Sequence, residues 1–448
     1  MNERNAGRAG ATRRGFLTGT AGLAAAAGSA LGGAVPALAK TEPAAPADRE
    51  PFWGAHQAGI ATPSQTHTYF AAFDLTATRR DEIVRVLRAW TAAAARLADG
   101  LPMAPFAETE KVYSFDTTTT TTTTASQPVT TTVSASDSGE ATGLPPARLT
   151  LTFGFGAGLF EKGGKDRYGV AKQRPEALVE LPRFAGDQLV EAHSGGDLSV
   201  QACADDPQVA FHAVRQLARL AAGVAQLRWA QAGFMPNFGQ NERPRNLMGF
   251  RDGTVNPSPT DPAVMQQVVW VGNEGPDWLH GGSYVIARRI RIALEHWDRM
   301  TVAFQERTFG RHKASGAPLG MKHETDALDL NATDKDGNPI IPQNSHVHLA
   351  AAASNGGAQI LRRPYSYNNG ADFIAERWPP WRQGIEYDAG LFFICYQRDP
   401  RTGFIKIFEK MAKLDMLNQF STHVSSGLFA CPSGIARGEF IGQRLFAA

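Results

Sequence analysis

Gly249-Phe250-Arg251-Asp252-Gly253-Thr254 and the later stretch Ile341-Pro342-Gln343-Asn344-Ser345-His346 are the two segments around which the chain is organised. In the first segment, one carboxylate stands beside a glycine in a tight turn. Glycine lacks a Cβ, so the backbone there is free to adopt a positive φ or to approach a flat ligand closely. Taken alone, an Asp-Gly pair is equally typical of a plain surface turn. The segment therefore indicates a site through its combination with others.

Three segments together resemble the dye-decolourising (DyP-type) peroxidases, a family of haem enzymes. Gly249 to Thr254 resembles the GxxDG signature of that family. Ser345-His346-Val347 resembles its proximal-histidine segment, and Leu361-Arg362-Arg363-Pro364-Tyr365-Ser366-Tyr367 resembles its distal-arginine segment. The three segments follow one another in the family's order, and the resemblance extends from Pro51 to Phe446.

This resemblance implies one haem b per chain and gives three residues distinct roles. His346 would be the proximal ligand of the haem iron, as a neutral imidazole is in many haem proteins. Asp252 would move the proton of bound peroxide, and Arg362 would stabilise the charge that develops. An aspartate in this role predicts activity at acidic pH. The resemblance also implies haem contacts from Arg362 and from two short runs, Gly253, Thr254, Val255 and Ala351, Ala352, Ala353.

Two neighbouring residues compete with the chosen ones. His348 lies two positions after His346, and in a strand both side chains would point to the same face. Arg363 directly follows Arg362. The family's pattern places ligation on the histidine after Ser or Ala and the distal role on the first arginine, which favours His346 and Arg362.

The chain also departs from the family's pattern. His348 replaces the usual arginine, Ala351-Ala352-Ala353 replaces an Asn-Pro-Arg run that contacts haem in the deferrochelatase branch, and Pro364 replaces a glycine. These departures affect the expected propionate contacts and the access to the haem edge. A carboxylate should accept the second N–H of the proximal imidazole, and the sequence interpretation assigns this role to Asp399.

Length and composition describe a globular protein with two domains of ordinary size. The chain has 448 residues, of which 43% are hydrophobic and 20% charged. The net charge of +2 and the absence of a basic run with interleaved aromatic residues argue against nucleic-acid binding. Cys203, Cys395 and Cys431 have no zinc-site spacing and suggest no disulfide framework, so each is predicted to be a small buried residue.

The N-terminus is predicted to be a cleaved targeting segment, residues 1–39. Arg13-Arg14-Gly15-Phe16-Leu17 resembles a twin-arginine signal, and an Ala/Gly-rich run then leads to Ala37-Leu38-Ala39, a typical cleavage site. A membrane anchor is the alternative, but alanine and glycine partition poorly into hydrocarbon. We therefore expect no integral membrane protein, with a linker at 40–50 and a periplasmic or extracellular location.

Hydrophobic periodicity predicts an α+β fold with two similar halves. A Thr-rich stretch, 116–143, is predicted to be a surface insertion without a catalytic role. The elements predicted for the first half are strands at 66–75, 147–155, 198–204 and 225–233 with helices at 79–97 and 207–222. Those predicted for the second half are strands at 282–294, 389–397 and near Phe429 with helices at 295–308 and 404–417. This order indicates two ferredoxin-like halves, 51–235 and 236–448, in which antiparallel sheets carry helices. The haem is expected in the C-terminal half.

Two classes of function remain open. The first is an exported peroxidase that reduces hydrogen peroxide and oxidises bulky aromatic or porphyrin donors. The second is a haem-binding component of an iron-uptake system, because the run from Pro51 to Pro63 resembles the start of the deferrochelatase/peroxidase branch of bacterial iron uptake. Asp252 and Arg362 have no evident purpose in a carrier and favour the enzyme. A protein of this fold without haem is a third alternative. Partners are expected to be peroxide, a donor, iron-uptake proteins and further copies of the chain in a homo-oligomer.

Overall fold

Two four-stranded antiparallel sheets, one from each half of the chain, form the frame of the protein. The computed structural model describes residues 48–104, 136–236, 243–375 and 383–447, which belong to one compact unit. Its nine described strands are hydrogen-bonded in the order β5-β9-β2-β3-β1-β4-β7-β8-β6, and β5 also pairs with β8. This additional pairing closes the order into a ring.

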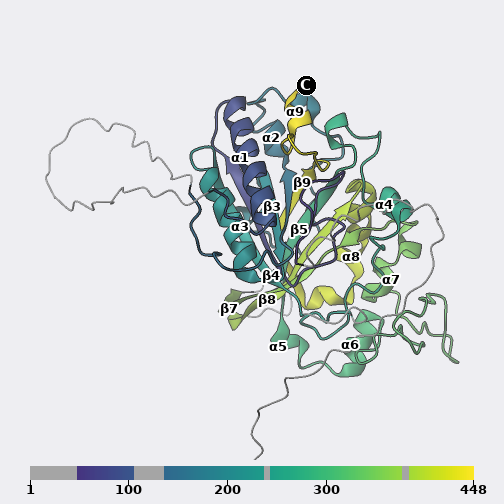
Figure 1. Cartoon of the computed structure of the whole chain (residues 1–448). Helices are drawn as coiled ribbons and strands as arrows, with labels where there is room; N and C mark the ends of the chain where they lie inside the picture. Colours follow the sequence, from purple (N-terminus) through teal and green to yellow (C-terminus); the bar gives the residue numbers. More distant parts are fainter. Residues whose placement is uncertain (1–47, 105–135, 237–242, 376–382, 448) are drawn as a thin grey trace, which may run out of the picture. The chain divides into compact units, whose positions relative to one another are not determined.

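The first half contributes the strand order β2-β3-β1-β4. Its elements are β1 (His67–Leu75), α1 (Arg80–Ala98), β2 (Thr150–Phe155), α2 (Ala157–Phe160), β3 (Leu198–Ala204), α3 (Pro207–Leu220) and β4 (Ala225–Phe234). The strand pairs β1–β3, β1–β4 and β2–β3 are all antiparallel. Helices α1 and α3 lie side by side against these strands (Figure 1). The predicted strands and helices of this half are confirmed, with ends shifted by up to three residues.

The second half contributes the strand order β7-β8-β5-β9. Its strands are β5 (Ser283–Ile292), β6 (Leu361–Arg362), β7 (Tyr365–Ala375), β8 (Gln383–Gln397) and β9 (Ser421–Cys431). Its α-helices are α4 (Pro262–Val268), α5 (Leu294–Trp297), α6 (Val302–Phe309), α7 (His346–Ala350), α8 (Lys406–Leu414) and α9 (Gln443–Ala447). Short β6 pairs with the end of β8, so Arg362 is fixed to the sheet opposite Cys395.

The two sheets join at two narrow contacts and enclose a shared apolar interior. One backbone pair, Phe155 with Ala430, links β2 to β9, and another, Phe234 with Ser366, links β4 to β7. Between the sheets, the Phe70 ring of β1 lies 5.8 Å from a ring of β8 and 6.0 Å from a ring of β9. Because strand side chains alternate between faces, the opposite face of the second sheet is left to line another compartment.

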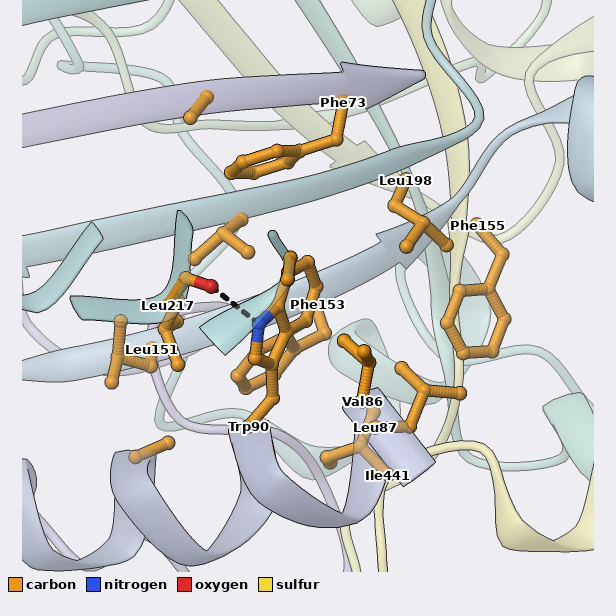
Figure 2. Close-up of a cluster of buried hydrophobic side chains, with 14 of the residues drawn as sticks. Phe73, Val86, Leu87, Trp90, Leu151, Phe153, Phe155, Leu198, Leu217 and Ile441 are labelled. Atoms are coloured by element: carbon orange, nitrogen blue, oxygen red, sulfur yellow. Dashed lines mark hydrogen bonds between the residues drawn. The ribbon is translucent and has the colours of Figure 1, made fainter. Parts of the chain in front are cut away.

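A second core fills the space between the first sheet and its helices. Trp90 of α1 is 1% exposed and packs against Phe73 and Phe153, as Figure 2 shows. Its indole Nε1 donates a hydrogen bond of 2.7 Å to the Leu217 carbonyl of α3, which satisfies the buried N–H. Asp206 starts α3 by accepting hydrogen bonds from the first-turn backbone, as an N-cap residue does.

Several predicted elements of the second half are wrong in detail. The helix predicted at 295–308 is two helices, α5 and α6, because Thr301 caps a new helix by accepting a hydrogen bond from the Phe304 N–H at 3.3 Å. The helix predicted at 404–417 is a π-turn at Arg401–Ile405 followed by α8, which stops before Asp415. β8 begins six residues before the predicted strand at 389–397, and β7 was not predicted.

The segments with targeting and insertion predictions fall mostly outside the described residues. The signal segment 1–39, most of the linker 40–50, and residues 116–135 of the Thr-rich stretch lie there. Cys203, Cys395 and Cys431 are buried free thiols, as predicted. Within the part of the chain that the structure describes, no helix is both long enough and apolar enough to cross a membrane.

Candidate active site

A largely apolar cavity lies against the outer face of the second sheet. The space in it that water can occupy measures about 270 Å³. Its floor comes from alternate residues of β5 and β8, and helices α6, α7 and α8, which lie close together in Figure 1, supply further walls. Its apolar wall includes Ile290, Ile292, Leu391, Phe393, Phe404 and Phe408. Asp252, Arg362 and His346 all line this one cavity.

Asp252 and Arg362 form an ion pair at the cavity wall. Arg362 Nη1 donates to Asp252 Oδ1 at 2.8 Å, and the two side chains are 28% and 15% exposed, respectively. Gly249 and Gly253 both have φ of +85°, a conformation that disfavours side chains other than glycine's. The Asp252 N–H also donates to the Pro244 carbonyl at 2.9 Å. These contacts hold the carboxylate in a turn of fixed shape.

Asn256 fixes the backbone of Arg362 to the same turn. Its side-chain oxygen accepts from the Arg362 N–H, and its side-chain nitrogen donates to the Arg362 carbonyl, both at 2.8 Å. The neighbouring Arg363 points elsewhere, since it is 3% exposed and donates to the Thr62 carbonyl and the Gln65 side chain. Of the two arginines, the structure brings Arg362 into the cavity beside Asp252.

His346 is the first residue of α7, a helix rather than a strand. The preceding Ser345 is fully buried and donates its hydroxyl to the Pro342 carbonyl at 2.7 Å. His346 Nδ1 lies 2.7 Å from Oδ2 of Asp415, which is 3% exposed. A carboxylate accepts and does not donate, so Nδ1 is the donor in this contact, and in the neutral imidazole Nε2 then has the lone pair. This tautomer suits an imidazole that binds a metal through Nε2.

The assignment of the imidazole's partner to Asp399 is wrong. Asp415 fills that role from the loop directly after α8. Asp399 lies after β8, where both of its carboxylate oxygens accept from Arg401 and Oδ1 also accepts from the Arg401 N–H. These local contacts use the Asp399 carboxylate to start the turn at 401–405.

His348 does not share the cavity with His346. It lines a neighbouring pocket near Leu328, because a two-residue step along a helix turns the side chain to a different face. Burial, together with the charge of Lys410, lowers the pKa of His348 from its ordinary value. The competition between the two histidines is therefore decided by helical geometry in favour of His346 at this cavity.

Five of the six residues predicted in the two haem-contact runs line the cavity. They are Gly253, Thr254, Val255, Ala351 and Ala352. Ala353 lies one step further and lines two adjoining pockets instead. The alanine run therefore lines both the main cavity and the two pockets that adjoin it.

Two buried groups at the cavity were not singled out from the sequence. His423 of β9 is 8% exposed, and burial, with a contribution from Arg288, lowers its pKa well below the ordinary value. Burial also lowers the pKa of Arg311, an effect that Glu324 opposes and that the positive charge of Arg362 increases. A guanidinium remains protonated at neutral pH, so Arg311 is a second cation in the wall that holds Arg362.

Local signals could have revealed some of these residues. Asn256 stands three positions after Gly253, and an asparagine side chain can pair with both the N–H and the carbonyl of a neighbouring backbone segment. Asp415 stands just after an amphipathic helix, where a carboxylate commonly caps the next turn, and its Oδ1 does accept from the Leu417 N–H at 2.9 Å. Nothing local ties Asp415 to His346, which precedes it by 69 positions.

Comparison with known proteins gives consistent results. Residues 57–235 match the family model "Dyp-type peroxidase, N-terminal", and residues 243–436 match "Dyp-type peroxidase, C-terminal". A dye-decolorizing peroxidase of Thermobifida fusca is 35% identical over 99% of both chains. A deferrochelatase of Escherichia coli K12 is 33% identical over 89% of this chain and 87% of its own. A solved DyP-type peroxidase from Streptomyces coelicolor superposes with a TM-score of 0.76 at 38% identity, covering 89% of this chain and 97% of its own.

Proposed function

This chain belongs to the DyP-type peroxidase family, and from that premise we propose that it is an exported haem b peroxidase with one haem per chain. Its substrates are hydrogen peroxide and bulky aromatic or porphyrin-type donors. One observation carries the proposal: the His346–Asp415 pair and the Asp252–Arg362 pair line the same apolar cavity.

The donor set of the cavity fits the haem that the family implies. An imidazole with Nδ1 committed to a carboxylate has Nε2 left for iron, and the apolar walls suit a flat macrocycle. We place the haem in the C-terminal half, within 236–448. The strand orders β2-β3-β1-β4 and β7-β8-β5-β9 support two ferredoxin-like halves, with the first at 51–235.

Haem supplies the iron at which the O–O bond of peroxide is split. His346 would hold the iron, and the negative charge of Asp415 makes its imidazole a stronger donor. Asp252 would accept the proton of incoming peroxide at a carboxylate oxygen and return it to the departing oxygen atom. Arg362, already 2.8 Å from that carboxylate, would stabilise the negative charge that develops as the bond breaks.

Export and a link to iron uptake are further parts of the proposal. The twin-arginine segment at Arg13-Arg14 supports transport of the folded, cofactor-loaded protein to the periplasm or the extracellular space. The second candidate function is a haem-binding component of iron uptake, with other proteins of that system and further copies of this chain as its partners. The 33% identity to a deferrochelatase favours keeping this candidate.

The distal pair distinguishes a peroxidase from a carrier. Asp252→Ala and Arg362→Leu should bind haem with wild-type occupancy, because neither side chain is proposed to hold iron. At least one variant should react with peroxide about 10²–10⁴-fold more slowly, the usual contribution of a proton-transferring group. Stopped-flow absorbance at acidic and neutral pH measures the rate, with haem content determined in parallel. Wild-type rates in both variants would exclude the distal assignment and favour the carrier.

A further inference from the structure

The segment between α6 and α7, residues 310–345, packs against the loop that carries Asp252. Glu324 of this segment contacts one residue before and one residue after Asp252 in the sequence. Its Oε1 accepts from the Thr254 hydroxyl at 2.8 Å, and its Oε2 lies 3.2 Å from Arg251 Nε in an ion pair. The Glu324 side chain is 18% exposed, and that of Arg251 is 21% exposed. One carboxylate thus connects residues that lie on either side of Asp252 in the sequence.

The 310–345 segment and the Asp252 loop are closely packed around the Glu324 contacts. A Cβ at Gly316, which has φ of +78°, would lie 2.8 Å from Arg251 Cδ and 3.2 Å from Glu324 Cγ. A Cβ at Gly249 would lie 2.7 Å from Lys313 Cε. A side chain at either glycine would therefore require the neighbouring Arg251 or Lys313 side chain to shift. The 310–345 segment therefore packs closely against the Asp252 loop through these side chains.

The backbone of Glu324 is itself hydrogen-bonded by a buried arginine. Arg311 is 6% exposed, and its Nη1 donates to the carbonyls of Glu324 at 3.0 Å and Gly316 at 2.7 Å. Arg311 thus fixes the backbone of Glu324, and the Glu324 carboxylate extends from this fixed backbone to Thr254 and Arg251.

The pairing of Glu324 with Arg251 also affects the charge around Asp252. Arg251 is adjacent to Asp252 and lines the same cavity. A guanidinium without an anionic partner is attracted to carboxylates in its surroundings. Glu324 supplies Arg251 with an anionic partner, so this cation beside the Asp252 loop is not left unpaired.

We propose that Glu324 is a positioning residue that holds the Asp252 carboxylate in place for reaction with peroxide, through its contacts with Thr254 and Arg251. The inference rests on the proposed role of Asp252. Misplacement of a reacting group by about 1 Å is enough to slow a reaction about 10²-fold. Glu324 acts through its neighbours, since it does not itself line the cavity.

The test compares Glu324→Ala and Glu324→Gln in wild-type and Asp252→Ala backgrounds. Glu324→Ala removes both contacts and should slow the peroxide reaction about 10²-fold at unchanged haem content. Glu324→Gln keeps an acceptor for Thr254 but no charge for Arg251, so its rate should lie between those of wild type and Glu324→Ala. With Asp252 already replaced, neither change should slow the reaction further, since a positioning residue acts through the group that it positions. Asp336→Ala, an exposed carboxylate of the same segment, is the matched control and should keep the wild-type rate.

A second measurement does not depend on haem. Hydrogen exchange of the apoprotein should show faster exchange of the backbone amides of residues 250–256 in Glu324→Ala than in wild type or Asp336→Ala. Unchanged exchange there would overturn the proposal, and so would an equal rate loss from Glu324→Ala in both backgrounds. If Asp252→Ala alone reacts at the wild-type rate, the proposed role of Asp252 fails, and the proposed function fails only if Arg362→Leu does so too. The exchange measurement then still tests whether Glu324 stabilises the loop at residues 250–256.

Discussion

Replacing Asp415 by asparagine tests the structural basis of the proximal site. The Asp415 side chain accepts two hydrogen bonds with different oxygens, one from His346 Nδ1 at 2.7 Å and one from the Leu417 N–H at 2.9 Å. An asparagine side chain has one accepting oxygen, and its amide nitrogen only donates. One of the two N–H groups must therefore lose its acceptor.

The size of the effect follows from burial and charge. The Asp415 side chain is 3% exposed, so water cannot readily replace the lost acceptor. A fully buried donor without a partner costs about 1–3 kcal/mol. Because the His346 side chain is 34% exposed, the free energy of unfolding of the apoprotein should fall by at most that amount. If the amide nitrogen faces His346, the imidazole also loses its orientation. Partners of this kind are worth about 10–100-fold in metal affinity or activity, and haem affinity should fall within that range.

Two measurements on purified protein check this expectation. Urea unfolding of the apoprotein gives the stability change, and titration of apoprotein with haem, followed at the Soret band, gives the affinity. Asp399→Asn is the matched control, because that carboxylate pairs with Arg401 away from the cavity and should leave haem affinity unchanged. Wild-type haem affinity together with wild-type stability in Asp415→Asn would refute the reasoning. A loss of haem affinity in Asp399→Asn instead would also refute it.

Four further predictions address the iron ligand, pH, export and the Thr-rich stretch. His346→Ala should lose or strongly weaken the Soret band of histidine-ligated ferric haem, whereas an unchanged band would remove His346 as ligand. Because burial lowers the pKa of His423, this imidazole stays neutral in the folded chain while the unfolded chain takes up a proton below about pH 6.5. The free energy of unfolding of the apoprotein should fall as pH drops below that value, by up to about 1.4 kcal/mol per pH unit for this one group. Urea unfolding of His423→Gln at a series of pH values should show a shallower fall. An equal slope of the free energy of unfolding against pH in wild type and variant would contradict this. Lysines at Arg13 and Arg14 should leave the precursor uncleaved in a fractionation assay, and normal processing would argue against a twin-arginine signal; deletion of residues 117–124 should leave the haem spectrum unchanged.

The sequence predicted the elements of the first half because their signals are local. Trp90 and its apolar neighbours recur at helical spacing in α1, and β3 lies at Leu198–Ala204, where the run of small and apolar residues predicted it. The second half was harder to predict because its breaks depend on single caps. Thr301 divides one predicted helix into two, and an apolar periodicity that continues across it gives no sign of the break.

The sequence by itself also identified the residue types of the site, through motifs short enough to be read locally. Asp252, His346 and Arg362 come from three distant segments, and the tertiary structure brings them to one cavity. Only that structure could decide between Asp399 and Asp415. Either carboxylate could serve an imidazole chemically, but hydrogen bonds act over about 3 Å. The packing of α7 beside α8 places Asp415 at that distance from His346, while local contacts commit Asp399 to Arg401.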